Sequence, residues 1–261
     1  MPMLQNPIAL KTLSLSQPIK KALHTAARLE YDGVQIDTRR EVHPSELSET
    51  GLRQFRKMLD DLNLRVGSVA FPTRRGYADA DDLQRRMDAA IASMRLASEL
   101  SARTMVFTLG SIPESEDSSY TTLLDVLGTL GVHGNRLGVS LAAHAPEAEI
   151  EQLTALLEAL PAGTLGLDLN PAALIARGDS PSAFLKSVGQ HVCHVFANDA
   201  VRGFGETSST SVELGRGSAD LPALLGAMEE HNYRGWITVE RSGSENLIED
   251  CTNAVKFLRS L

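Results

Sequence analysis

The sequence predicts a single (β/α)8 TIM barrel, and three observations lead to that fold class. The chain has 261 residues, close to the length of about 250 residues that is typical of such barrels. Eight short apolar segments recur along it at a mean spacing of about 33 residues, as a repeated βα unit requires. In several of them polar and apolar residues alternate, which gives the strand one polar face. A closed barrel encloses such a face, whereas an open parallel sheet buries both faces and reads apolar on both.

The predicted strands follow one another along the whole chain. The alternation is clearest in the sixth and eighth strands, where Asp168 and Asn170 alternate with leucines, and Thr238 and Glu240 alternate with branched apolar residues. These polar side chains are therefore expected to point into the barrel. The eight strands are predicted at residues 7–13, 33–37, 64–71, 103–109, 137–144, 164–170, 191–198 and 236–240.

Helix patterns fill the intervals between these strands. Apolar residues recur at helical spacing, most clearly at Leu52, Phe55 and Leu59, and Pro171 stands at a helix start. The helices are predicted at residues 17–29, 46–62, 80–100, 118–130, 147–159, 171–188, 219–231 and 245–260. Because no Pro-, Gly- or Ser-rich linker interrupts the alternation, one domain is expected over residues 1–261.

Composition narrows the class of protein. The net charge of −8 and the sequence pI of about 5.4 argue against nucleic acid as a partner. No apolar run approaches the ~18 residues of a membrane span, and no signal peptide is expected at the N-terminus. Two cysteines, Cys193 and Cys251, are too few for a disulfide scaffold. A soluble cytoplasmic protein is expected.

Candidate catalytic residues follow from the rule that such barrels place their chemistry at the C-terminal ends of the strands. Glu240 closes the eighth strand, and a carboxylate there is costly to bury without a partner. A salt bridge to Arg241 or to another arginine at the rim is the structural alternative. His144, at the end of the fifth strand, is equally consistent with a functional group and with a hydrogen-bonded core residue. Asp168 and His194 face inward about 6–7 Å deeper, where buried polar packing is expected.

Three loop features have two interpretations each. Asp37 is expected to cap a loop or to pair with Arg39 or Arg40. Arg74, in the loop after the third strand, could meet an anionic substrate, although a solvated loop is the simpler interpretation. The segment 215–217 (GRG) could offer backbone N–H groups to a phosphate, or it could form a turn before a helix.

Several stretches of the chain resemble the xylose-isomerase-like TIM-barrel superfamily. In the C-terminal third these are 194–199 (HVFAND), 214–220 (LGRGSAD) and 233–240 (YRGWITVE). The second strand of that group resembles residues 31–35 (YDGVQ), and its fifth strand resembles residues 138–142 (GVSLA). The end of its sixth strand resembles the Asn170–Pro171 pair. The group contains sugar-phosphate isomerases and epimerases, hydroxypyruvate isomerases, keto-inositol dehydratases and endonucleases of the endonuclease IV type.

The resemblance implies a divalent metal (Mn, Mg or Zn) held by Glu, Asp, His and Glu at the ends of strands five to eight. Transferred to this chain, those ligand positions fall on His144, Asn170, Phe196 and Glu240. Only Glu240 is retained; His144 could ligate through an imidazole nitrogen, and Phe196 cannot ligate. The substrate-binding His of the group falls on Ala173, and its substrate-binding Arg is retained as Arg202. One negative charge replaces three, so metal binding is expected to be weak or absent.

The resemblance favours a sugar, keto-sugar or sugar-phosphate isomerase or epimerase, or a related lyase, that transfers a proton next to a carbonyl. In that hypothesis Glu240 is the base and His144 its acid–base partner or a residual ligand. Arg202, Asn170 and Arg74 bind the substrate.

Two other hypotheses stay open. A barrel that has lost catalysis and binds a small metabolite or a protein is the alternative, because two ligand positions and the substrate-binding His are replaced. DNA repair is the remote third, since it needs a cluster of His and acidic zinc ligands. The expected partner is a small sugar-like molecule, without nucleic acid or membrane, and a homo-oligomer is possible.

Overall fold

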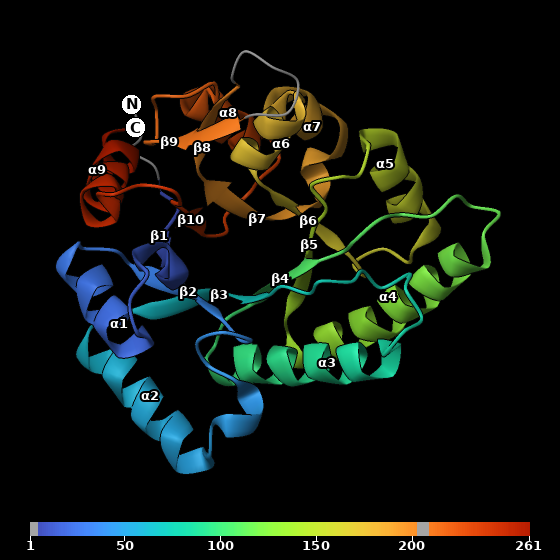
Figure 1. Cartoon of the computed structure of the whole chain (residues 1–261), viewed down its shortest axis with the longest axis horizontal. Coiled ribbons are helices and arrows are strands. Elements are labelled where there is room, and N and C mark those ends of the chain that lie inside the picture. The colour runs from blue at the N-terminus through green and yellow to red at the C-terminus, as the bar shows by residue number, and fades with distance from the viewer. Residues whose placement is uncertain (1–4, 203–208) are drawn as a thin grey trace.

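Eight parallel strands close into one barrel in the computed structural model, which describes residues 5–202 and 209–261 (Figure 1). The closing pair is the first and the last barrel strand, with Leu10 in register with Val239. The strands, in their order around the barrel, are β1 (Ile8–Lys11), β10 (Ile237–Val239), β7 (Val192–Ala197), β6 (Gly166–Leu169), β5 (Ser140–His144), β4 (Thr104–Thr108), β3 (Arg65–Phe71) and β2 (Gly33–Asp37). Each coincides with a predicted strand, so the predicted fold class is confirmed.

The helices surround the barrel between the strands. They are α1 (Ile19–Arg28), α2 (Glu49–Asp61), α3 (Leu83–Glu99), α4 (Ser118–Leu137), α5 (Ile150–Ala159), α6 (Pro171–Arg177), α7 (Pro181–Val188), α8 (Leu221–Glu230) and α9 (Leu247–Ser260). Short 3-10 turns lie at Thr12–Leu15, Pro44–Glu46 and Gly189–His191.

The predicted helix over 171–188 is wrong in one respect, because it is two helices. Gly178 ends α6 with a φ of 96°, which glycine adopts without strain. Ser180 then caps α7 by accepting a hydrogen bond from the Ala183 N–H, and Pro181 occupies the first turn.

A two-stranded antiparallel hairpin, β8 (Asp199–Arg202) with β9 (Ser209–Val212), follows β7 and was not predicted. Its base is fixed by the buried Asp199 carboxylate, which accepts hydrogen bonds from the backbone N–H groups of Gly215, Gly217 and Ala219. The Gly215–Gly217 segment is therefore a turn whose two glycine N–H groups already have a carboxylate partner, as the simpler interpretation expected.

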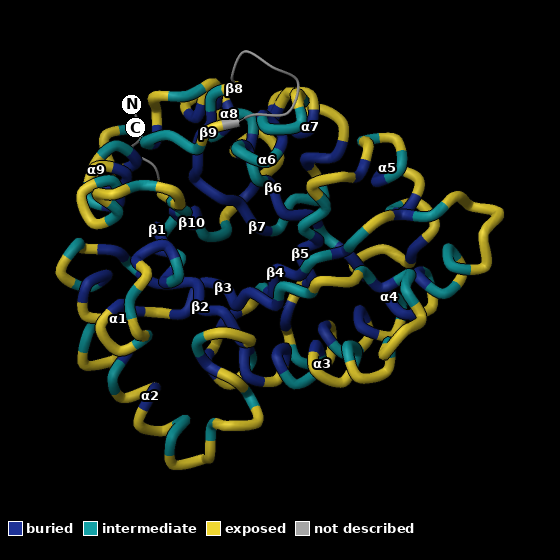
Figure 2. The backbone as a smooth tube through the Cα atoms, viewed as in Figure 1, coloured by how far each residue is buried: buried dark blue, intermediate teal, exposed yellow. Residues whose placement is uncertain are grey.

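The barrel strands are buried along most of their length, and what alternates along them is the chemistry of the side chains (Figure 2). Branched apolar side chains fill the layer between barrel and helices, as Val34, Ile36 and Leu167 do. The barrel interior instead holds buried polar groups, namely Gln35, Ser68, Asp168, His194 and Thr238, beside a small apolar cluster of Val106, Ala142 and Phe196. The polar inner face that the sequence predicts is therefore present.

Trp236 lies against two glycines at the N-terminal end of the barrel strands. A Cβ built on Gly67 would lie 2.6 Å from the indole, and one on Gly33 would lie 2.7 Å from it. The Arg65 guanidinium also lies over the Trp236 ring, 4.7 Å from its centroid. The indole can therefore approach β2 and β3 closely because Gly33 and Gly67 have no side chain.

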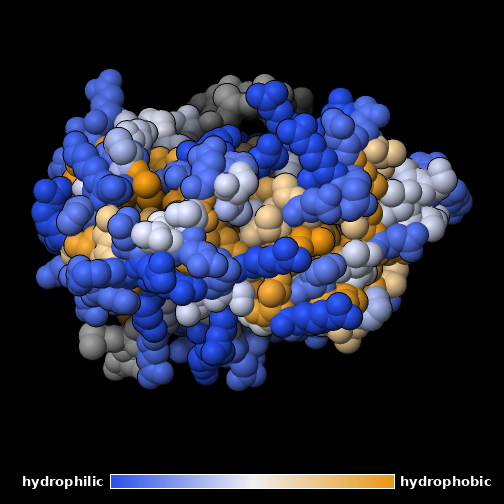
Figure 3. Space-filling view, turned by 90° about the horizontal axis from the view of Figure 1, so that it is seen from below, coloured by the Kyte–Doolittle hydropathy of each residue, from blue (hydrophilic) through white to orange (hydrophobic). Residues whose placement is uncertain are grey.

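The face of the molecule that carries α2 and α3 shows mostly hydrophilic side chains, with smaller hydrophobic areas between them (Figure 3). This is the pattern expected of helices that bury one side against the barrel. No helix in residues 5–202 and 209–261 is long and apolar enough to cross a membrane. Cys193 and Cys251 are both free thiols, so they form no disulfide bond with each other.

Candidate functional site

A cavity of about 130 Å³ opens at the C-terminal ends of the barrel strands. Three of the residues selected from the sequence, His144, Asn170 and Glu240, line it together. All eight barrel strands or their following loops contribute to its wall, which also includes Lys11, Asp37, Arg40, Thr108 and Phe196. The barrel closure therefore brings to one mouth residues that are up to 229 positions apart in the chain.

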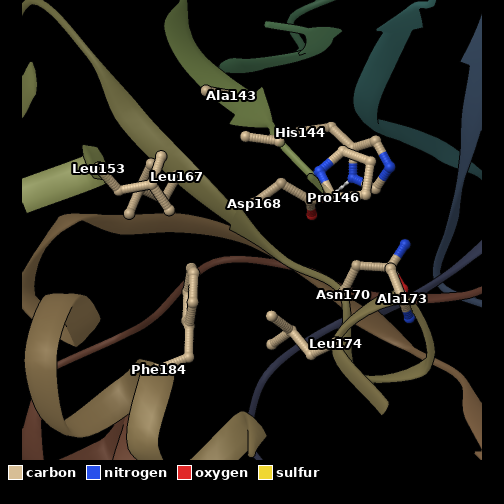
Figure 4. Close-up of a pocket in the computed structure, with 11 residues that line it drawn as sticks. Ala143, His144, Pro146, Leu153, Leu167, Asp168, Asn170, Ala173, Leu174 and Phe184 are labelled. Atoms are coloured by element: carbon tan, nitrogen blue, oxygen red, sulfur yellow. Dashed lines mark hydrogen bonds and ion pairs between the residues drawn. The ribbon is translucent and has the colours of Figure 1, made fainter. Parts of the chain in front are cut away.

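Asp168 joins two histidines at the floor of this mouth. Its Oδ2 lies 2.9 Å from His144 Nδ1, and its Oδ1 lies 2.7 Å from His194 Nδ1. Figure 4 shows the His144 ring, from β5, turned onto the Asp168 carboxylate of β6, with Asn170 farther along the same chain segment. The carboxylate is fully buried, whereas 28% of the His144 side chain is exposed. His144 is thus the member of this triad that reaches the cavity.

The hydrogen bonds fix which ring atom of His144 faces the mouth. Burial opposes ionisation of Asp168, but the hydrogen bonds from His144 and His194 outweigh it and lower the pKa of Asp168. An ionised carboxylate only accepts, so both Nδ1 atoms donate to it. Nε2 of His144 is then the atom left for chemistry. Burial lowers the pKa of His144, but the Asp168 hydrogen bond and charge more than offset it, so this pKa is raised.

Both ring nitrogens of His194 have hydrogen-bond partners. Its Nε2 lies 3.0 Å from Thr238 Oγ1 and 3.2 Å from both Gln35 Nε2 and Ser68 Oγ. With only 1% of its side chain exposed, His194 is the buried polar packing group that the sequence predicts. Its bond to Asp168 orients the carboxylate on which His144 rests.

The expected depth of Asp168 relative to His144 is wrong. Alternation along β6 places Asp168 one inward position deeper in the barrel than Asn170. The sequence therefore predicts that Asp168 lies below the mouth and apart from His144. Neighbouring parallel strands are staggered, however: Ala143 is in register with Leu167, which puts His144 beside Asp168. A side chain at the mouth thus contacts a side chain of the buried interior directly.

Glu240 is paired, but not with an arginine. Its Oε1 accepts a hydrogen bond from Lys11 Nζ, and its Oε2 accepts one from Asn198 Nδ2 at 2.8 Å and a longer one from Asn170 Nδ2 at 3.4 Å. Arg241, the partner that the structural alternative named, instead binds Asp250 at 2.7 Å. One ammonium and two amides therefore surround the Glu240 carboxylate, which is only 23% exposed.

Lys11 is the functional candidate that sequence reasoning missed. It is the last residue of β1, and its ammonium lies 5.1 Å from the centroid of the Phe196 ring. The predicted first strand ran to residue 13, so Lys11 did not stand at a predicted strand end. The rule of C-terminal ends selects it once the strand is seen to stop at residue 11.

Residues 23–261 match the family model described as xylose isomerase-like TIM barrel. The chain belongs to this family. No curated protein matches the chain. A xylose isomerase domain protein from Planctomyces limnophilus has the same fold, with a TM-score of 0.86 and 20% identity, covering 99% of this chain and 97% of its own.

Two further solved structures have the same xylose isomerase-like fold. One is a xylose isomerase-like TIM barrel protein from Mycobacterium smegmatis in complex with magnesium, with a TM-score of 0.83 and 18% identity over 100% of this chain and 98% of its own. The other is a D-psicose 3-epimerase in the presence of D-fructose, with a TM-score of 0.75 and 14% identity over 97% and 98% of the two chains.

The donor set at the mouth of this xylose isomerase-like barrel does not fit a divalent cation. The oxygens of Glu240 accept from Lys11 and two amides, and the Asn170 Oδ1 accepts from Ala173 N and from Asn198 Nδ2. Phe196 carries no donor atom. In residues 5–202 and 209–261, no group of three or more His, Cys, Asp or Glu side chains is arranged to hold a metal ion. Hard cations need several converging oxygens, and an ammonium beside the remaining carboxylate repels them.

The two arginines expected to bind substrate are not part of the mouth cavity. Arg202, at the end of β8, lies over Gly178, where any side chain would collide with its guanidinium. Arg74 is exposed in the loop after β3. Arg40 lines the cavity instead. Asp37 Oδ1 caps the loop after β2 by accepting from the backbone N–H groups of Arg39 and Arg40, as one of the two interpretations of Asp37 expected. Contacts of Arg74 and Arg202 with a substrate stay predictions.

Proposed function

We propose that this protein is a sugar isomerase or epimerase that transfers a proton next to a carbonyl of a small polyhydroxy compound, with His144 as the proton carrier. The observation that carries the proposal is the His144–Asp168 pair, whose ring is held by a buried carboxylate and whose Nε2 is left for a ligand in the mouth cavity. Family membership supports the same class of chemistry, since relatives of this fold include proteins named as epimerases.

The proton step uses the two atoms of the imidazole separately. Nε2 of neutral His144 takes the proton from the carbon next to the carbonyl, and the electron pair of that C–H bond moves toward the carbonyl oxygen to form an enediolate. Asp168 stabilises the imidazolium through the Nδ1–H that it already accepts. An isomerisation is complete when the proton returns to the former carbonyl carbon and the hydroxyl proton of the neighbouring carbon passes to the former carbonyl oxygen, so that the neighbouring carbon becomes the new carbonyl. Returning the proton to the other side of the carbon that lost it requires a second carrier and completes an epimerisation.

Glu240 lies in the same cavity and is the second carrier in this proposal. Its carboxylate oxygens already accept hydrogen bonds from Lys11, Asn170 and Asn198. His144, whose pKa is raised by Asp168, is therefore assigned the first proton transfer. A cavity of about 130 Å³ suits a small sugar and not a polymer.

The test is exchange of carbon-bound hydrogen with solvent. A panel of small ketoses and aldoses, with and without phosphate, is incubated in D₂O with the protein and followed by NMR for loss of the signal next to the carbonyl. We expect exchange with at least one member, and a loss of about 100-fold or more in H144N. The matched control is H24N, which changes an exposed histidine on α1 and is expected to leave the rate unchanged. Absence of exchange across the panel contradicts the proposal.

A barrel that binds a sugar-like molecule without turning it over is the second candidate. The specific observation in its favour is Phe196, an apolar ring at a position where the family resemblance implies a metal-ligating histidine. Thermal stabilisation of the protein by a sugar that shows no hydrogen exchange would select this candidate.

A further inference from the structure

The mouth contains the ammonium group of Lys11 at the place where the family resemblance implies a metal. Lys11 Nζ contacts one of the four family ligand positions, Glu240, and lies 5.1 Å from the ring centroid of a second, Phe196. The other two positions, His144 and Asn170, line the same cavity. The ammonium therefore lies among all four positions.

The register of the barrel builds this arrangement. Leu10 of β1 is in register with Val239 of β10, so the residues that follow, Lys11 and Glu240, leave neighbouring strands side by side. Lys11 itself is in register with Gln35 of β2. The ammonium is thus held by the closing seam of the barrel and not by a loop.

Phe196 and Lys11 are chemically matched. The face of an aromatic ring carries partial negative charge and attracts an ammonium within about 6 Å of its centroid. A histidine at the same place would add donors that compete with the ammonium for Glu240. The Phe196 ring is buried and held edge-to-face by His194 at 4.7 Å. Phe196, at the position of a metal-ligating histidine, therefore both lacks a metal ligand and provides an aromatic face for the Lys11 ammonium.

We propose that the ammonium of Lys11 is the resident cation of this site, in place of a divalent metal, and that it binds the carbonyl oxygen on which negative charge develops. The claim that Lys11 replaces the metal, which is the binding part, is independent of any activity. The claim that it binds the carbonyl oxygen, which is the catalytic part, rests on the proposed function. The ammonium has three N–H donors, of which Glu240 takes one, and it lies in the same cavity as His144. A fixed donor at an oxygen that becomes negative lowers the barrier to proton removal.

The binding part is tested with metal alone, independently of any activity. Two variants restore ligand chemistry: N170D/F196H keeps Lys11, and K11M/N170D/F196H removes it. Mn²⁺ binding is measured by isothermal titration, with circular dichroism as the check of folding. We expect no saturable binding by the unchanged protein at millimolar Mn²⁺. The triple variant should bind about tenfold or more tightly than the double variant, because the ammonium repels a dication from the same place. Equal affinities of the two variants, or tight Mn²⁺ binding by the unchanged protein, overturn the proposal.

The catalytic part is tested on the same exchange assay with single variants, so poor folding of the triple variant does not leave the proposal untested. We expect K11M to lose about 100-fold or more in kcat with little change in KM, and K11R, which keeps the charge, to retain most of the rate. Equal losses in K11M and K11R overturn the role of the charge. A ketose adduct on Lys11 after borohydride reduction also overturns it, because the amine would then act as a nucleophile. If no sugar exchanges at all, the proposed function fails while the metal experiment still decides on Lys11.

Discussion

Replacing Asp168 by Asn is the perturbation that best separates the buried triad from ordinary packing. The carboxylate is fully buried and accepts the Nδ1–H of two histidines at 2.9 and 2.7 Å. An Asn keeps one acceptor but turns an NH₂ group toward one of the two imidazoles, so a donor meets a donor. Removing one partner of a buried charged pair costs about 3–5 kcal/mol. For a chain of this size that corresponds to a fall in Tm of about 2 °C per kcal/mol, so at least about 6 °C.

The pH dependence of this loss follows from the two shifted pKa values. The pKa of Asp168 is lowered, so its contribution to stability is present above about pH 4 and is lost as pH falls through the folded-state value. The pKa of His144 is raised, so its contribution is present below about pH 6.5 and is lost as pH rises through the folded-state value. The charged pair is complete between these limits. We therefore expect the unfolding free energy lost in D168N to be larger at about pH 5.5 than at about pH 9.

The assay is urea unfolding followed by circular dichroism at both pH values, with thermal melts alongside. D125N is the matched control, since Asp125 is exposed on α4 and its replacement should change stability by no more than about 0.5 kcal/mol. A D168N protein with the stability of D125N, or a loss that does not grow on acidification, would refute the reasoning.

Three further changes test other parts of the structure. G67A should destabilise the protein by about 1–3 kcal/mol, because its Cβ would lie 2.6 Å from the Trp236 indole. G128A is the control, at a helical position with nothing within 4 Å, and it should be neutral or stabilise by up to about 1 kcal/mol. Urea unfolding of the two variants measures the difference. D199N should free the 214–220 loop, seen as faster proteolysis there at nearly unchanged core hydrogen exchange, because the carboxylate accepts three backbone N–H groups of that loop. Y77F should not lower Tm, because the buried Tyr77 hydroxyl has no hydrogen-bond partner among the described residues; a clear fall would show that a water or ligand satisfies it.

Much of the fold could be predicted because strand alternation is a local signal. All eight barrel strands lie within their predicted ranges, and the inward positions of Asp168, His194 and Thr238 follow from the period of two alone. The split of the predicted 171–188 helix was also encoded locally, in Gly178 and in the capping Ser180 before Pro181. The β8–β9 hairpin was not predicted, because its strands are four residues each and carry no strong apolar pattern.

The candidate site was predictable only in part. The rule of strand ends selected His144, Asn170 and Glu240, which the barrel does bring to one cavity. It missed Lys11, because a strand end is the least certain boundary in a sequence. Arg241, which the structural alternative offered Glu240 as a partner, is bound elsewhere. The rule also placed Asp168 below His144, because one strand read alone contains no information on the stagger of its neighbour.

Periodicities within a few residues specify the barrel, the order of its elements and the side chains that point inward, so these features can be predicted from the amino-acid sequence. Which of the inward side chains contact one another is fixed only when the chain folds. The contacts of Lys11 with Glu240, and of His144 with Asp168, depend on the register between strands, and that register is set by closure of the whole sheet and not by any one segment.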